Sequence, residues 1–147
     1  MTRTILTLAA GAVIGVGGLT LAQTGHGHGT GPTVKTLSAV DVGEELNGKP
    51  ARATTQEVTF EPGAASAPHR HPGPVFGYVL EGELEFQAGE APARRLKAGD
   101  TFYEPAMVLH AVARNPSDKA RTRVLVVIIH PRESKALEVP EPAKGGR

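Results

Sequence analysis

The sequence predicts an all-β fold, a small sandwich or barrel, and three observations support this prediction. Glycine and proline are abundant, with 18 Gly and 12 Pro in 147 residues, about 20% of the chain against a usual ~12%. Short segments of β-branched and alternating apolar residues recur at intervals of roughly 8–12 residues, as in sandwiches and barrels. Turn residues separate these segments, and this density of chain-breaking residues excludes a helical bundle.

The first residues have the pattern of a secretory signal peptide, residues 1–22. A basic start at Arg3 precedes an uncharged apolar run, Ile5–Leu21, and Thr20 and Ala22 are the small residues that a cleavage site needs. The run is shorter than the ~20 apolar residues of a comfortable membrane span. We therefore expect cleavage after residue 22, export to the periplasm or the medium, and no stable insertion in a membrane.

Residues 23–50 are predicted to form a flexible linker and N-terminal arm. The linker sequence QTGHGHGTGP has no apolar periodicity, which is typical of a solvated tether. Its histidines, His26 and His28, are flanked by glycines that leave the imidazoles unfixed, so they could capture a metal ion only loosely. One short helical turn is expected around Val42–Leu46.

Residues 51–132 are predicted to form the barrel, and residues 133–147 a flexible C-terminal tail. A run of uninterrupted apolar residues, Val124–Ile129, indicates a strand buried on both faces. The strongest turn signal is Asn115–Asp118. The expected strands share β-branched or alternating residues and lie near 54–60, 75–80, 83–87, 94–97, 101–103, 108–114 and 122–130.

Composition excludes several classes of function. The formal net charge is +1 and the basic residues are scattered, so the chain lacks the basic patch of a nucleic-acid-binding protein. It contains no cysteine, which excludes disulfides, thiolate metal sites and a cysteine nucleophile.

The histidines offer the clearest chemical signal, His69-Arg70-His71. In an extended segment, residues i and i+2 lie on one face about 6.6 Å apart, so two imidazoles can converge on one cation while the arginine points away. Taken alone, the His-x-His pair is also what two ordinary surface histidines would give, and it does not by itself establish a metal site. His130 ends the apolar strand, and we expect it to be a surface cap.

Two motifs around these histidines resemble those of the cupin superfamily. Gly63 is followed by five residues, then by His69-Arg70-His71, and Gly82 stands where the first motif ends. In the second motif, Gly99, Pro105 and His110 keep the family's spacing. The resemblance covers about residues 55–130. It implies a double-stranded β-helix, or jelly-roll, barrel with His69, His71 and His110 as metal ligands in its mouth, and a homodimer, as in many family members.

The chain departs from the family pattern at three positions. Val75 stands where the first motif has its ligand Glu, and Met107 and Arg114 replace a Gly and an Asn of the second motif. Glu104 and Gln56 are the candidates for a replacement fourth ligand, although an exposed polar side chain is the favoured interpretation of each.

Three functions remain open at this point. The first is a module that binds a divalent metal and a small organic ligand, the second a metal-dependent oxygenase or isomerase, and the third a structural cupin without metal. Three imidazoles suit Zn, Fe, Mn, Ni or Cu. Without a carboxylate the ion would keep its full positive charge and attract small carboxylates or chelating diketones. We expect Phe76, Tyr78, Phe86, Tyr103 and Met107 in the core or around an apolar pocket.

Overall fold

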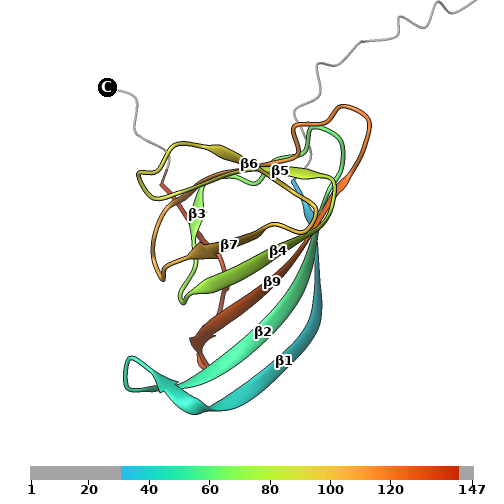
Figure 1. Ribbon diagram of the computed structural model, residues 1–147. Coiled ribbons are helices and arrows are strands. Elements are labelled where there is room, and N and C mark those ends of the chain that lie inside the picture. The colour runs from blue at the N-terminus through green and yellow to red at the C-terminus, as the bar shows by residue number, and fades with distance from the viewer. Residues whose placement is uncertain (1–30, 143–147) are drawn as a thin grey trace, which may run out of the picture.

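The computed structural model describes residues 31–142, and all the regular structure in that range is β-strand (Figure 1). The all-β prediction is confirmed. No helix within the described range is long and apolar enough to span a membrane. The strands are β1 Thr33–Leu46, β2 Lys49–Phe60, β3 His69–Arg70, β4 Val75–Glu81, β5 Glu83–Ala88, β6 Arg94–Lys97, β7 Thr101–Glu104, β8 His110–Arg114, β9 Thr122–Pro131 and β10 Val139–Pro140.

The strands form two antiparallel sheets that face each other (Figure 1). One sheet has the order β1-β2-β9-β4-β7 and the other β10-β3-β8-β5-β6. Alternation places one side of each strand between the sheets, as in β4, whose residues are buried and exposed in turn. The enclosed core consists of Phe60, Ala64, Val75, Val79, Leu84, Phe86, Leu96, Phe102, Ala113, Val124 and Ile128.

The turns with a left-handed backbone include two within the histidine motifs. Gly82, between β4 and β5, has φ of 76°, and a Cβ there would lie 2.5 Å from the carbonyl oxygen of Arg121, so only glycine fits. Met107 has φ of 60° at the position where the second cupin motif has glycine. The turn geometry is therefore retained without the residue that favours it.

The ends of the barrel differ from the sequence-based expectation. The helical turn expected at Val42–Leu46 is wrong, because these residues belong to β1, which pairs with β2 along most of its length. Residues 133–142 of the expected tail lie against the barrel, where β10 pairs with β3. The signal peptide, His26 and His28 fall outside the described residues.

The outer face of the first sheet carries the aromatic residues expected in the core. Phe76 and Tyr78 on β4 and Tyr103 on β7 are exposed, and the rings of Phe76 and Tyr103 lie 5.2 Å apart. Beside them, Leu125 and Val127 of β9 pair with Tyr78 and Phe76 and are half-buried. Alternation turns Phe76 and Tyr78 outward, so the expectation that they are core or pocket residues is wrong. Tyr103 is also exposed, but it lines a second pocket together with Phe86, and Phe86 is a core residue, as expected. Met107 is exposed, so the same expectation is wrong for it.

Two buried polar groups away from the histidine motifs are fully hydrogen-bonded. His130 is buried, so the surface-cap expectation is wrong: its Nδ1–H donates to Pro131 O, and Thr54 Oγ1 donates to its Nε2, each at 2.9 Å. Asn115, just after β8, donates its amide hydrogens to the carbonyl oxygens of Phe60, Glu61 and Ala120.

Candidate metal centre

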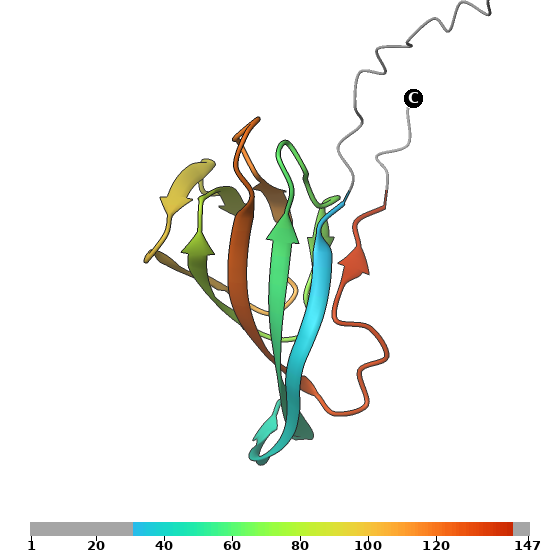
Figure 2. The same cartoon turned by 90° about the vertical axis from the view of Figure 1, so that its right-hand side faces the viewer.

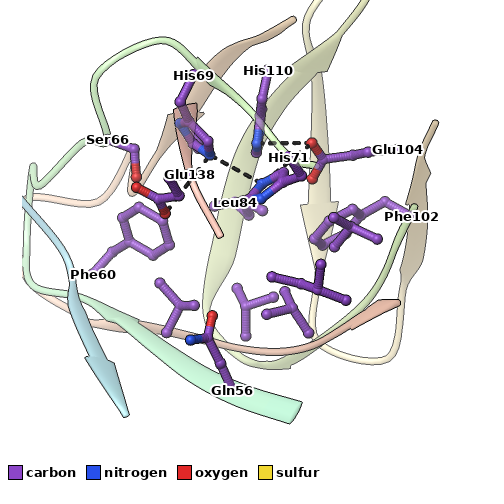
Figure 3. Close-up of a pocket in the computed structure, with 16 residues that line it drawn as sticks. Gln56, Phe60, Ser66, His69, His71, Leu84, Phe102, Glu104, His110 and Glu138 are labelled. Carbon is purple, nitrogen blue, oxygen red and sulfur yellow. Dashed lines mark hydrogen bonds and ion pairs between the residues drawn. The ribbon is translucent and has the colours of Figure 1, made fainter. Parts of the chain in front are cut away.

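Three buried histidines meet at one end of the barrel (Figure 3). His69 on β3 and His110 on β8 are paired residues across the two strands, and His71 follows β3 immediately. One ring nitrogen from each lies within 4.8 Å of the others. The structure thus brings together the three residues that the motifs single out.

The ring nitrogens of His69 and His71 are arranged to receive a cation. The Nδ1–H of His69 donates to Ala67 O at 2.8 Å, and the Nδ1–H of His71 donates to Leu137 O at 2.7 Å. A carbonyl can only accept, so in both neutral rings the hydrogen is on Nδ1 and Nε2 carries a lone pair. The two Nε2 atoms lie 3.1 Å apart. In these neutral rings neither Nε2 has a hydrogen to donate, and a cation between them would make the contact favourable.

Burial keeps the second of these rings neutral. Desolvation lowers the pKa of His71 below its usual value, against the opposing effect of the Glu104 carboxylate and the Leu137 carbonyl. A proton on His71 is thus a poor explanation of the close Nε2 pair. Backbone carbonyls that accept from the other ring nitrogen are also the usual partners of histidines that ligate metals.

Glu104, at the end of β7, adds a buried carboxylate. Its Oε2 lies 3.2 Å from His110 Nδ1 and 3.8 Å from His71 Nε2. Although the first distance is short, the atoms are not aligned for a hydrogen bond, and Glu104 Oε2 and both ring nitrogens of His110 are buried without a hydrogen-bond partner. Such orphaned groups are costly, and a cation bound among them would remove that cost.

The expectation that Glu104 is exposed is wrong, because its residue exposure is only 2%. Its Cα is paired with that of Val75 across β7 and β4, so the carboxylate comes from the strand beside the position of the missing Glu. The signal that could have found it is the alternation in β7, which places Glu104 on the same face as the core residue Phe102. The expectation that no carboxylate stands beside the three histidines is therefore also wrong.

Gln56, the other candidate fourth ligand, is not brought to the histidines. It lines the same cavity from β2 but lies on the side away from them (Figure 3). Its amide donates to Thr36 Oγ1 at 3.3 Å. The residues that fit a metal are therefore the three histidines and Glu104.

Beside the histidines, a cavity of about 50 Å³ extends between the sheets. This space admits a ligand of only a few heavy atoms. Ser66 and Glu138 stand at its polar side (Figure 3). Apart from the histidines and Glu104, most of its lining is apolar: Val58, Phe60, Val75, Leu84, Phe102, Ala113, Val124, Val126 and Ile128.

Comparison with known proteins agrees with this architecture. Residues 56–128 match the family model described as a cupin domain. The chain therefore belongs to the cupin superfamily. No curated protein sequence matches the chain significantly.

Similar solved structures include enzymes and uncharacterised proteins. A double-stranded β-helix protein from Klebsiella pneumoniae is 20% identical, with a TM-score of 0.56 over 76% of this chain and 86% of its own. The DMSP lyase DddQ from Ruegeria pomeroyi is 24% identical, with a TM-score of 0.58 over 78% of this chain. An oxalate oxidase in complex with the substrate analogue glycolate is 26% identical, with a TM-score of 0.51 over 66%. This chain spans about half the length of the two enzymes, 54% and 50% respectively.

Proposed function

We propose that the protein binds one divalent metal ion through His69, His71, His110 and Glu104. The observation that carries the proposal is the pair of Nε2 lone pairs 3.1 Å apart, next to the unpartnered buried atoms of His110 and Glu104. Three imidazoles and a carboxylate suit Zn, Fe, Mn, Ni or Cu. When bound, such an ion would supply Lewis acidity beside the cavity that these residues line.

The ligand class that we propose is a small organic anion, a carboxylate or an enolisable diketone. One carboxylate neutralises only part of the charge of a divalent ion, so an anion is favoured beside it. The small cavity limits the ligand to a few heavy atoms, and most of its walls are apolar, which favours a small organic body behind the anionic group. The likeness to the oxalate oxidase that was solved with glycolate supports the same class.

Turnover of such an anion is a second candidate function, favoured by that same likeness to an enzyme. It is tested by incubating metal-loaded protein with oxalate and following oxalate loss and oxygen uptake. Loss of oxalate that depends on both metal and His110 supports an enzyme. Binding without loss supports a sensing or sequestering module.

Calorimetry of untagged protein tests the binding function. Protein stripped with a chelator is titrated with each of the five metals, and the loaded form is then titrated with glycolate, oxalate and acetylacetone. The proposal expects one metal per chain and anion binding only to the loaded form. Metal-free protein that binds the anions equally well would refute the role of the metal, and absence of any metal binding would favour a structural cupin.

Export and dimerisation are proposals that rest on other features. The signal-peptide pattern of residues 1–22 supports export, and N-terminal sequencing of the exported protein should begin at Gln23.

The homodimer is proposed to form through the exposed aromatic face of β4 and β7. At the rim of this face Arg121 and Arg123 pair with Glu57 and Glu81, so these four side chains present no net charge to a second copy. In sedimentation, Phe76→Glu should yield monomers, and an unchanged mass would reject this interface.

A further inference from the structure

The segment after β9 returns to the metal centre. Its short strand β10 pairs with β3, with Val139 opposite Arg70 and Pro140 opposite His69, and the backbone N–H of Glu141 donates to Pro68 O at 3.0 Å. Figure 2 shows β10 beside the barrel, close to where the described chain ends. We call residues 137–141 the C-terminal strap.

The first residue of the strap, Leu137, orients a histidine. The carbonyl oxygen of Leu137 accepts the 2.7 Å hydrogen bond from His71 Nδ1, which places the His71 lone pair on Nε2, toward His69. The Leu137 side chain packs against the core, and this contact holds the carbonyl in place. Leu137 is therefore a positioning residue for the proposed ligand His71.

The next residue places a second carboxylate at the site. Glu138 Oε1 lies 3.9 Å from His69 Nε2, the nitrogen that faces His71 (Figure 3). The Glu138 side chain is 55% exposed, whereas that of Glu104 is 2% exposed. The two carboxylates thus differ in access, and Glu138 is the one that a cation arriving from solvent meets.

An ion pair latches the strap to the strand that bears the histidines. Arg70 stands between His69 and His71 and binds the Glu141 carboxylate in a bidentate manner, at 2.8 Å and 3.2 Å. Its third contact is a 2.8 Å hydrogen bond to Met107 O, on the loop that leads to His110. One side chain therefore joins the strap to both histidine-bearing segments, in the geometry that makes arginine–carboxylate pairs strong.

We propose that the C-terminal strap is the gate of the metal centre. Leu137 positions His71, Glu138 is the carboxylate at which the cation enters and leaves, and the Arg70–Glu141 latch sets how often the strap opens. Most of the strap is exposed and its strand has two residues, so it opens without unfolding the barrel. This inference rests on the proposed metal site.

Stopped-flow release of Zn²⁺ into an excess of a chromogenic chelator tests the gate. We expect Glu141→Gln to release Zn²⁺ about tenfold faster than wild type, and a chain ending at Ala136 up to about 100-fold faster, the range for losing partners of metal ligands. Glu138→Gln should slow Zn²⁺ loading and weaken its dependence on salt. One control should match wild type: Glu133→Gln, which removes an exposed ion pair with Lys49 made by the same segment after β9.

Thermal unfolding of the metal-free proteins separates gating from folding. The gate predicts that Glu141→Gln unfolds like wild type while its release rate changes. Equal release rates in wild type, Glu141→Gln and the chain ending at Ala136, all loaded with one Zn²⁺, would overturn the gate and leave the metal site standing. Wild type that binds no metal at all would overturn both.

Discussion

The two ends of β8 carry buried polar side chains of opposite character. After the strand, Asn115 donates to three backbone carbonyls and accepts from the N–H of Ser117. At its start, His110 has two buried ring nitrogens without a hydrogen-bond partner, beside an unpartnered oxygen of Glu104. One barrel therefore contains a satisfied polar cluster at one end and an unsatisfied one at the other.

This difference distinguishes a structural role from a binding role. A buried polar group with all its hydrogen bonds made stabilises the fold, and its removal leaves other groups unpaired. A buried group without partners costs stability, and its presence indicates a ligand that completes it. Substitution of a structural polar group should therefore lower the free energy of unfolding, whereas substitution of a binding group should mainly lower metal affinity.

The largest expected effect on metal binding is that of His110→Ala. Loss of one of four ligands should weaken metal affinity by at least about 100-fold. The free energy of unfolding of the metal-free variant should fall only by the amount that packing of the buried ring contributes. Calorimetry and metal counting measure this. The control His130→Gln changes a buried histidine outside the centre and should keep full metal content. If His110→Ala holds stoichiometric metal, the assignment of the centre is wrong.

Asn115→Ala should show the reverse pattern. The substitution leaves three backbone carbonyls without their donor, so the free energy of unfolding should fall by about 3 kcal/mol. Metal affinity of the folded variant should stay within twofold of wild type. Urea titration of metal-free protein measures the first quantity and calorimetry the second. A large loss of affinity would mean that the two ends of β8 are coupled.

Glu104→Gln should separate the two roles at one residue. The amide removes a buried unpaired charge, so we expect metal-free protein to be as stable as wild type or more stable. Metal affinity should fall by roughly 10- to 100-fold, because the amide is a weaker ligand for a cation. A variant that loses stability without losing metal would show that the carboxylate serves the fold.

A swap of the two paired positions should have the smallest effect. Val75 and Glu104 are partners across β4 and β7, so their side chains lie on one face about 5 Å apart. We expect Val75→Glu with Glu104→Val to bind metal within about tenfold of wild type, and Glu104→Val alone to bind far more weakly. Val75→Glu alone should bind metal more tightly and glycolate more weakly. If the double variant binds metal no more tightly than Glu104→Val alone, the carboxylate must come from β7 rather than from β4.

Much of this fold follows from local sequence patterns. The strands from β4 to β9 lie close to the predicted segments, because each combines alternating residues with a strong turn signal, such as Gly82 or Asn115–Asp118. β1 was missed because its side chains are almost all exposed, so no apolar periodicity marks it. β10 consists of two residues and depends on pairing with β3, which the sequence does not reveal.

The candidate site was predictable only in part. Motif spacing selects His69, His71 and His110, because the barrel places those positions together. Glu104 could have been found by alternation with Phe102, but Glu138 and the carbonyl of Leu137 reach the site only through the return of the chain after β9. Contacts between segments that are distant in the sequence leave no periodic pattern in it.

The most direct test of the metal centre is a long-range ¹H–¹⁵N spectrum of the histidine rings, recorded before and after one equivalent of Zn²⁺. In metal-free protein, the ring hydrogen of both His69 and His71 should be on Nδ1, where it bonds a backbone carbonyl. Zn²⁺ should then shift the Nε2 signals of both and one nitrogen of His110 together, and leave His130 unchanged as an internal control. Hydrogen on Nε2 of His69 or His71 in the metal-free protein, or signals of these rings that Zn²⁺ leaves in place, would contradict the account.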